Sequence, residues 1–120
     1  MQNLNQIRAR HVLEFAECFG KVSGSNGGEV IKKIPPVMMN NGLLSALAYA
    51  MDERNKSWRN VFDGIASHLA SQEIAIVPGK YAHAEALLEY LTSDQVSCNV
   101  LRVATAEAEA WLDFARRLVR

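Results

Sequence analysis

Residues 96–120 read VSCNVLRVATAEAEAWLDFARRLVR and contain neither proline nor glycine. Apolar and small side chains recur along this stretch at helical spacing, at Val96, Val100, Val103, Ala104, Trp111, Ala115 and Leu118, so that they gather on one side of a helix. Ser93 or Asp94 stands just before it as a candidate N-cap. A helix of about 25 residues is about 37 Å long. We therefore predict a long C-terminal helix.

Four segments upstream show the same period, residues 4–19, 36–51, 58–69 and 81–91. Residues 75–80 have the composition of a short strand, but no second run of alternating residues is present to pair with them. A chain of 120 residues buries roughly two thirds of its surface on folding, enough for one hydrophobic core. We predict an all-α fold, a single-domain bundle of about five helices that spans residues 1–120.

Proline and glycine mark the expected breaks between and within these helices. We expect the first helix to end at Gly20 and a flexible Gly/Ser-rich loop to occupy residues 20–28. Pro35-Pro36 disfavours helix in the residue before it, so the second helix is expected to begin near Pro36. Asn41-Gly42 inside that helix costs up to about 1 kcal/mol relative to alanine, which predicts a close helix contact or a local kink.

Composition places the chain among ordinary globular proteins. It has 13 basic and 13 acidic residues, so binding to nucleic acid or membrane by bulk charge alone is not expected. Cys18 and Cys98 stand too far apart in sequence to form a Cys-x-x-Cys pair, which favours an intracellular protein without a disulfide scaffold. The N-terminus lacks a secretory signal, and the longest uncharged run, residues 34–51, is too short and too broken to span a bilayer. We expect a cytoplasmic protein with no membrane contact.

The chemistry of known catalytic and metal sites is missing from the sequence. His11, His68 and His83 form no pair spaced for one metal ion, and neither a phosphate-binding loop nor a Gly-x-Ser-x-Gly elbow is present. Glu107, Glu109 and Asp113 are interpreted as a solvated helix face. We therefore expect no catalytic residue, no metal and no cofactor, and hence no enzyme.

Charge is unevenly spread along the chain. Residues 1–60 carry eight basic and five acidic side chains, and residues 61–120 carry five basic and eight acidic ones. Basic groups gather near the expected helix ends, among them Arg116 and Arg117. Such a distribution suits head-to-tail stacking or the laying of a basic edge on a phosphate backbone, and it is equally compatible with surface charge that has no specific partner.

Three patches in order along the chain resemble a known family. They are Gln6-Ile7-Arg8-Ala9, then Pro35 with the run from Asn41 to Tyr49 (NGLLSALAY), then the run from Thr105 to Leu118. Together they are similar to the small α-helical subunit of the Cmr complex, the RNA-targeting type III-B CRISPR-Cas effector. The sequence departs from that pattern in the glycine-rich insertion after Gly20, in the loop from Gln72 to Lys80, and in Phe114, where a second Trp is common.

The resemblance implies a non-catalytic small subunit used in antiviral defence. Its expected partners are the backbone and large subunits of the complex, further copies of itself, and the backbones of guide and target RNA. The rival interpretations are a helical adaptor or dimeric regulator that binds only protein, and an enzyme with an unrecognised site. Lysine and arginine bind phosphates without regard to base sequence, as support of a variable guide requires.

The expected contacts to the RNA backbone are basic side chains, namely Arg8, Lys32, Lys33, Arg54, Lys56, Arg59, Arg116 and Arg117. Arg8 matches the opening of the family pattern, and the others follow from clustering alone. Their alternative role is solubility or ion pairing within the bundle. Trp58 and Trp111 have the chemistry of base-stacking platforms, but each lies in an apolar helical stripe, which favours core packing.

Overall fold

In the computed structural model, α5 (Cys98–Leu118) is second in length only to α2, and the described residues form four other α-helices. They are α1 (Leu4–Ser23), α2 (Gly27–Ala50), α3 (Lys56–Ala70) and α4 (Ala84–Leu91), with a short 3₁₀ helix, η3 (Gly79–Tyr81), before α4. The structure describes residues 3–23, 27–52, 56–94 and 96–118, and no strand occurs within them. The predicted all-α fold with a long C-terminal helix is confirmed.

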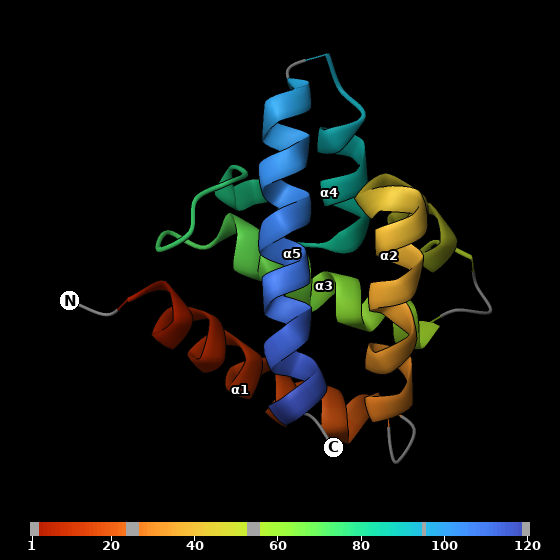
Figure 1. Ribbon diagram of the computed structural model, residues 1–120, viewed down its shortest axis with the longest axis vertical. Coiled ribbons are helices and arrows are strands. Elements are labelled where there is room, and N and C mark those ends of the chain that lie inside the picture. The colour runs from red at the N-terminus through yellow and green to blue at the C-terminus, as the bar shows by residue number, and fades with distance from the viewer. Residues whose placement is uncertain (1–2, 24–26, 53–55, 95, 119–120) are drawn as a thin grey trace.

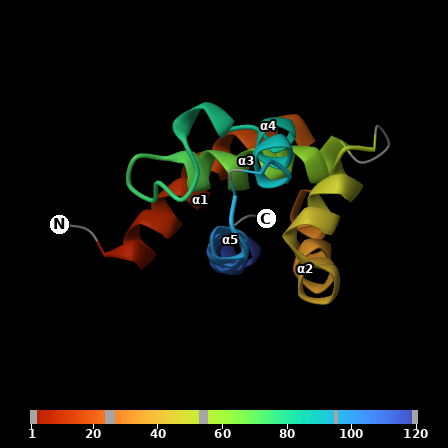
Figure 2. The same cartoon turned by 90° about the horizontal axis from the view of Figure 1, so that it is seen from above.

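Helix α5 is packed on one side by the rest of the bundle. Figure 1 shows it running along the length of the molecule, with α1 crossing near its C-terminal half and α2 at its flank. Viewed from above, α1, α3 and α4 form a layer, and α5 lies against one side of that layer (Figure 2). Half of the six buried positions of α5 are alanines, namely Ala104, Ala108 and Ala115. Alanine allows the larger side chains of α2 and α3 to approach closely.

Side chains close the helix ends, and they explain where the helices begin. At α1, the Asn3 and Gln6 side chains each accept the other residue's main-chain N–H at 2.8 Å, which is a reciprocal cap. Ser97 Oγ accepts the N–H of Val100 at 3.2 Å, so α5 starts later than the Ser93 or Asp94 cap predicted. Asp63 on α3 accepts the N–H of Ala84 at 2.8 Å and thereby caps α4 from a neighbouring helix.

Helix α2 corrects the prediction of a start near Pro36. The helix begins at Gly27 and contains both Pro35 and Pro36. Ile31 and Ile34 have no exposed surface, and burying side chains of that size contributes about 1.5–3 kcal/mol each, which offsets the local cost of the prolines. The irregularity lies instead at Gly42, whose φ of 82° and ψ of 172° are not helical. A Cβ there would meet nothing within 4 Å, so the local kink is confirmed rather than the close contact.

The predicted loop at residues 20–28 is shorter than expected. Helix α1 continues to Ser23 and α2 starts at Gly27, so helix occupies both ends of that segment. Glycine lowers helix propensity by about 1 kcal/mol without forbidding the helix, and sequence rules for helix ends are correspondingly imprecise. Residues 24–26 lie outside the described residues.

Candidate functional site

Five of the eight predicted RNA contacts have side chains that the structure describes, and three of these five are exposed. Lys33 lies exposed on α2, and Arg116 and Arg117 lie exposed in the last turn of α5. Arg54 lies outside the described residues, as do the side chains of Lys32 and Lys56. The exposed cations are thus presented by two helices that pack against each other, α2 and α5.

Arg116 and Arg117 share one carboxylate. An Arg116 nitrogen lies 3.1 Å from Asp113 Oδ1, and an Arg117 nitrogen lies 3.6 Å from Oδ2 of the same residue. The three side chains are between 46% and 67% exposed, so these pairs are well solvated. Solvated ion pairs contribute only about 0–1 kcal/mol. A phosphate therefore competes easily with Asp113 for these two guanidinium groups.

Arg59 is used to close a helix end within the molecule. This half-buried side chain donates a hydrogen bond from one terminal nitrogen to the carbonyl oxygen of Met51, at 2.8 Å, just beyond the last residue of α2. A cationic side chain at the carbonyl end of a helix is electrostatically favourable. The Nε of Arg59 is buried without a hydrogen-bond partner in the part of the chain that the structure describes.

Arg8 joins α1 to α5 through a bidentate ion pair. Its Nε and one terminal nitrogen each lie 2.7 Å from a different carboxylate oxygen of Glu107, and its other terminal nitrogen donates to Asn5 Oδ1 at 2.9 Å. Only 18% of the Arg8 side chain and 8% of the Glu107 side chain are exposed. Pairs of this geometry are among the stronger polar contacts in proteins. Arg8 thus performs the ion pairing within the bundle that was the alternative to RNA contact.

Glu107 corrects the interpretation of the acidic residues on the last helix. Its oxygen Oε2 also lies 2.8 Å from Nε2 of His68, which comes from α3. Both residues are buried, so Glu107 belongs to the interior and not to a solvated face. The position was recognisable in the sequence, because Glu107 falls three residues after Ala104 and four before Trp111, within the apolar stripe.

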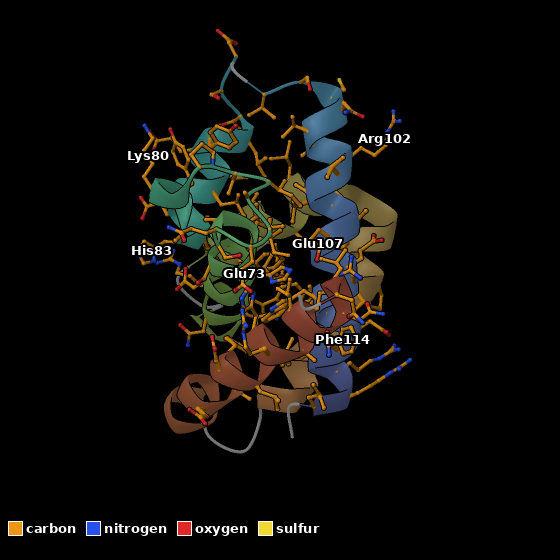
Figure 3. All side chains as sticks on the ribbon, turned by 90° about the vertical axis from the view of Figure 1, so that its left-hand side faces the viewer. Glu73, Lys80, His83, Arg102, Glu107 and Phe114 are labelled. Carbon is orange, nitrogen blue, oxygen red and sulfur yellow. The ribbon has the colours of Figure 1, made fainter. Side chains whose placement is uncertain are left out.

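The polar contacts continue from His68 to the surface. His68 Nδ1 lies 2.8 Å from His11 Nδ1, and His11 Nε2 lies 3.3 Å from Glu73 Oε1. Arg10 pairs with the same Glu73 oxygen. Figure 3 labels the two carboxylates of this chain of contacts, Glu107 on α5 and Glu73 on the loop that follows α3. We call Glu107, His68, His11 and Glu73 the histidine relay.

Burial and hydrogen bonding set the protonation of the histidine relay. Loss of solvent lowers the pKa of His68 below its ordinary value, although the hydrogen bond to Glu107 opposes that effect. Burial alone would raise the pKa of Glu107, but the hydrogen bonds from Arg8 and His68 outweigh it, and the pKa lies below its usual range. The hydrogen bond from Arg10 lowers the pKa of Glu73. At neutral pH both carboxylates are therefore ionised and His68 is neutral.

A cleft of about 570 Å³ opens beside the histidine relay. Its lining includes His11 and Phe15 of α1, Asp63 and His68 of α3, and His83 before α4. The hydroxyl of Ser71, which also lines it, donates to the main-chain carbonyl of His68 at 2.8 Å and not to an imidazole. Among the described residues no group of three or more His, Cys, Asp or Glu side chains is arranged to hold a metal ion.

The two tryptophans pack as core residues. Trp111 is fully buried, and its ring meets that of Phe15 edge-on at a centroid distance of 5.1 Å. Trp58 is half-buried against the core and meets the ring of Tyr49 at 4.7 Å. Core packing, which the apolar stripes favoured over base stacking, accounts for both positions.

Arg102 is an exposed cation that the sequence analysis did not single out. It lies on the first half of α5 and projects outward from the bundle (Figure 3). Fourteen residues separate it from Arg116, which on a helix corresponds to about 21 Å and to nearly the same face. Helical spacing alone would have revealed it, since Arg102 shares a face with Arg116 and not with the buried alanines.

Comparison with known proteins gave one match. The family model described as "CRISPR-associated protein (Cas_Cmr5)" matches residues 4–120, nearly the whole chain. Neither the comparison with curated proteins nor the comparison with solved structures found a match. The described helices include none that is both long and apolar enough to cross a membrane.

Proposed function

The chain belongs to the Cmr5 family of CRISPR-associated proteins, small subunits of the Cmr complex, and we propose that it acts there as a non-catalytic support for RNA. In this proposal copies of the chain stack beside the backbone subunits, and exposed basic side chains hold the phosphates of guide and target RNA. The family match over residues 4–120 is the observation that carries the proposal.

The surface chemistry favours backbone contact without base recognition. Lys33, Arg116 and Arg117 are the proposed phosphate contacts, because they are exposed, and Arg102 extends the set along α5. Arg8 and Arg59 are assigned to the fold, since Glu107 and the end of α2 already engage their guanidinium groups. Arginine and lysine at phosphates position a strand and carry no base preference.

The zero net charge of the chain limits what one copy does alone. On single-stranded nucleic acid the slope of log affinity against log salt is about −0.7 per phosphate contact, so two or three contacts give weak binding at physiological salt. Stacked copies raise the effective concentration of each contact and turn several weak contacts into a stable hold. We therefore expect RNA affinity in the assembled complex and little in the isolated subunit.

The test uses the reconstituted complex and a labelled single-stranded RNA target. Arg116→Gln combined with Arg117→Gln is expected to weaken target binding by at least fivefold, while the subunit still assembles. Lys80→Gln is the matched control, because Lys80 is exposed but lies on η3 beside the Tyr81 ring. An unchanged affinity in the double variant would instead support an adaptor that binds only protein.

A further inference from the structure

The histidine relay contains an unusual contact, because two imidazole rings face each other through the same kind of nitrogen. The Nδ1 atoms of His11 and His68 are 2.8 Å apart, and the ring planes are inclined by 78°. A hydrogen bond at that distance needs a hydrogen on one nitrogen and a lone pair on the other. Two N–H groups cannot face each other there, so the number of protons on the pair determines whether the contact persists.

The outer partners identify which ring supplies that hydrogen. Glu107 is ionised and accepts only, so His68 must donate to it from Nε2. A neutral His68 then has a bare Nδ1. The hydrogen between the rings therefore belongs to Nδ1 of His11, and His11 donates to His68.

The outer nitrogen of His11 has room for one more proton. With His11 neutral, its bare Nε2 accepts from Arg10, which lies 3.4 Å away. With His11 protonated, Nε2 donates to the carboxylate of Glu73 at 3.3 Å, and the Nδ1 hydrogen still bridges to His68. The first added proton is thus absorbed without movement of either ring. A second proton would have to enter at His68 Nδ1, against the N–H of His11.

We propose that the contact between His11 and His68 acts as a latch between α1 and α3 that responds to the number of protons on the pair. The contact persists when the pair has gained no proton or one proton, and it breaks when a second proton binds. Opening separates the two rings in the cleft wall and loosens α1 from α3. The Arg8–Glu107 pair still ties α1 to α5, so the movement is local. The latch makes acid a regulator of this cleft, independently of any RNA contact.

The surrounding charges agree with the order of protonation. The carboxylate of Glu73 lies against the outer nitrogen of His11, and Glu14 on α1 and Asp63 on α3 line the same cleft. Arg8, reached through Glu107, and a protonated His11 both disfavour a proton on His68, whose side chain has no exposed surface. Arg10 of α1, Glu107 of α5 and His83 before α4 are the remaining titratable groups around the pair. Burial, which lowers the pKa of His68, acts in the same direction.

The direct test is a pH titration of the full chain followed by nitrogen NMR of the imidazole rings. We expect His68 to remain neutral, with its hydrogen on Nε2, when the pair takes up its first added proton. At lower pH, protonation of His68 is expected to reduce the hydrogen-exchange protection of α1 amides at least tenfold relative to α2. Entry of the first added proton at His68, or equal loss of protection in both helices, would overturn the proposal.

A variant separates the latch from general acid unfolding. His11→Asn places an amide near the position of Nδ1, which donates to neutral His68 and, after flipping, accepts from protonated His68. Its α1 protection is expected to change less than twofold over the same pH range. His83→Asn lines the same cleft outside the relay and is expected to behave like the parent chain. If α1 of His11→Asn loses as much hydrogen-exchange protection in acid as α1 of the parent chain, the latch is refuted. If the variant does not fold, the NMR titration of the imidazole rings in the parent chain tests the proposal by itself.

Discussion

Replacing Glu107 with glutamine tests the polar contact that joins three helices. Glutamine keeps the shape of the side chain and still offers an oxygen to His68, but it removes the negative charge that Arg8 binds through two 2.7 Å contacts. The guanidinium of Arg8 remains in place with 18% of its side chain exposed and with Asn5 as its remaining partner. The substitution therefore leaves a largely buried charge uncompensated.

The size of the loss follows from that burial. Removing one partner of a fully buried ion pair costs about 3–5 kcal/mol. The partial exposure of Arg8 and its bond to Asn5 relieve part of this cost, so we expect Glu107→Gln to lower the free energy of unfolding by about 2–4 kcal/mol. Asp113→Asn on the same helix removes the partner of two solvated arginines and is expected to cost about 0–1 kcal/mol. A domain has only about 5–15 kcal/mol of stability in total.

Urea unfolding at pH 7 measures both variants, with the slope against denaturant checked for constancy. Adding Arg8→Met to Glu107→Gln is expected to recover at least about 1 kcal/mol, because it removes the stranded charge. The buried pair does not hold α1 to α5 as described if Glu107→Gln lowers the free energy of unfolding no more than Asp113→Asn does. The same conclusion follows if adding Arg8→Met to Glu107→Gln lowers the free energy of unfolding further.

Two further predictions concern packing and acid. Gly64→Ala places a Cβ 2.6 Å from the Phe15 ring. The resulting overpacking costs about 1–3 kcal/mol, which exceeds the gain in helix propensity of up to about 1 kcal/mol. Thermal unfolding should show a lower midpoint for Gly64→Ala than for Gly79→Ala, whose added Cβ has its nearest neighbour 3.8 Å away. The folded-state pKa of His68 is lowered, so the unfolded chain binds more protons below about pH 6.5 and stability falls as the pH is reduced from there. The pKa of Glu107 is also lowered, and its contribution is lost in turn below about pH 4.5. Urea unfolding at a series of pH values would contradict this if stability stayed constant between pH 7 and pH 5.

The helices of this fold were predictable because their apolar side chains repeat at helical spacing. Helix α3 and the end of α5 agree closely with the sequence pattern, since each buries one clear stripe. Helix α2 was misjudged at its start, because the rule applied to Pro35-Pro36 describes the local chain, whereas the burial of Ile31 and Ile34 is a property of the whole bundle. Tertiary packing outweighed a local preference there.

The histidine relay was not predictable in the same way. His11, His68 and Glu107 are each separated by at least 39 residues, and only the packing of α1, α3 and α5 brings them together. The sequence carried one partial signal, a glutamate within the apolar stripe of the last helix. Identifying its partners requires the crossing of the helices, which spacing along a single chain does not provide.

The salt dependence of RNA binding by the reconstituted complex tests the central claim most directly. Each phosphate contact contributes about 0.7 to the slope of log affinity against log salt, so Arg116→Gln with Arg117→Gln should reduce the magnitude of that slope by about 1.4 for each copy that touches the strand. Lys80→Gln should leave the slope unchanged. If the double variant and the parent complex show the same slope, the last turn of α5 does not bind the RNA backbone, and the central claim that its exposed arginines hold RNA phosphates fails.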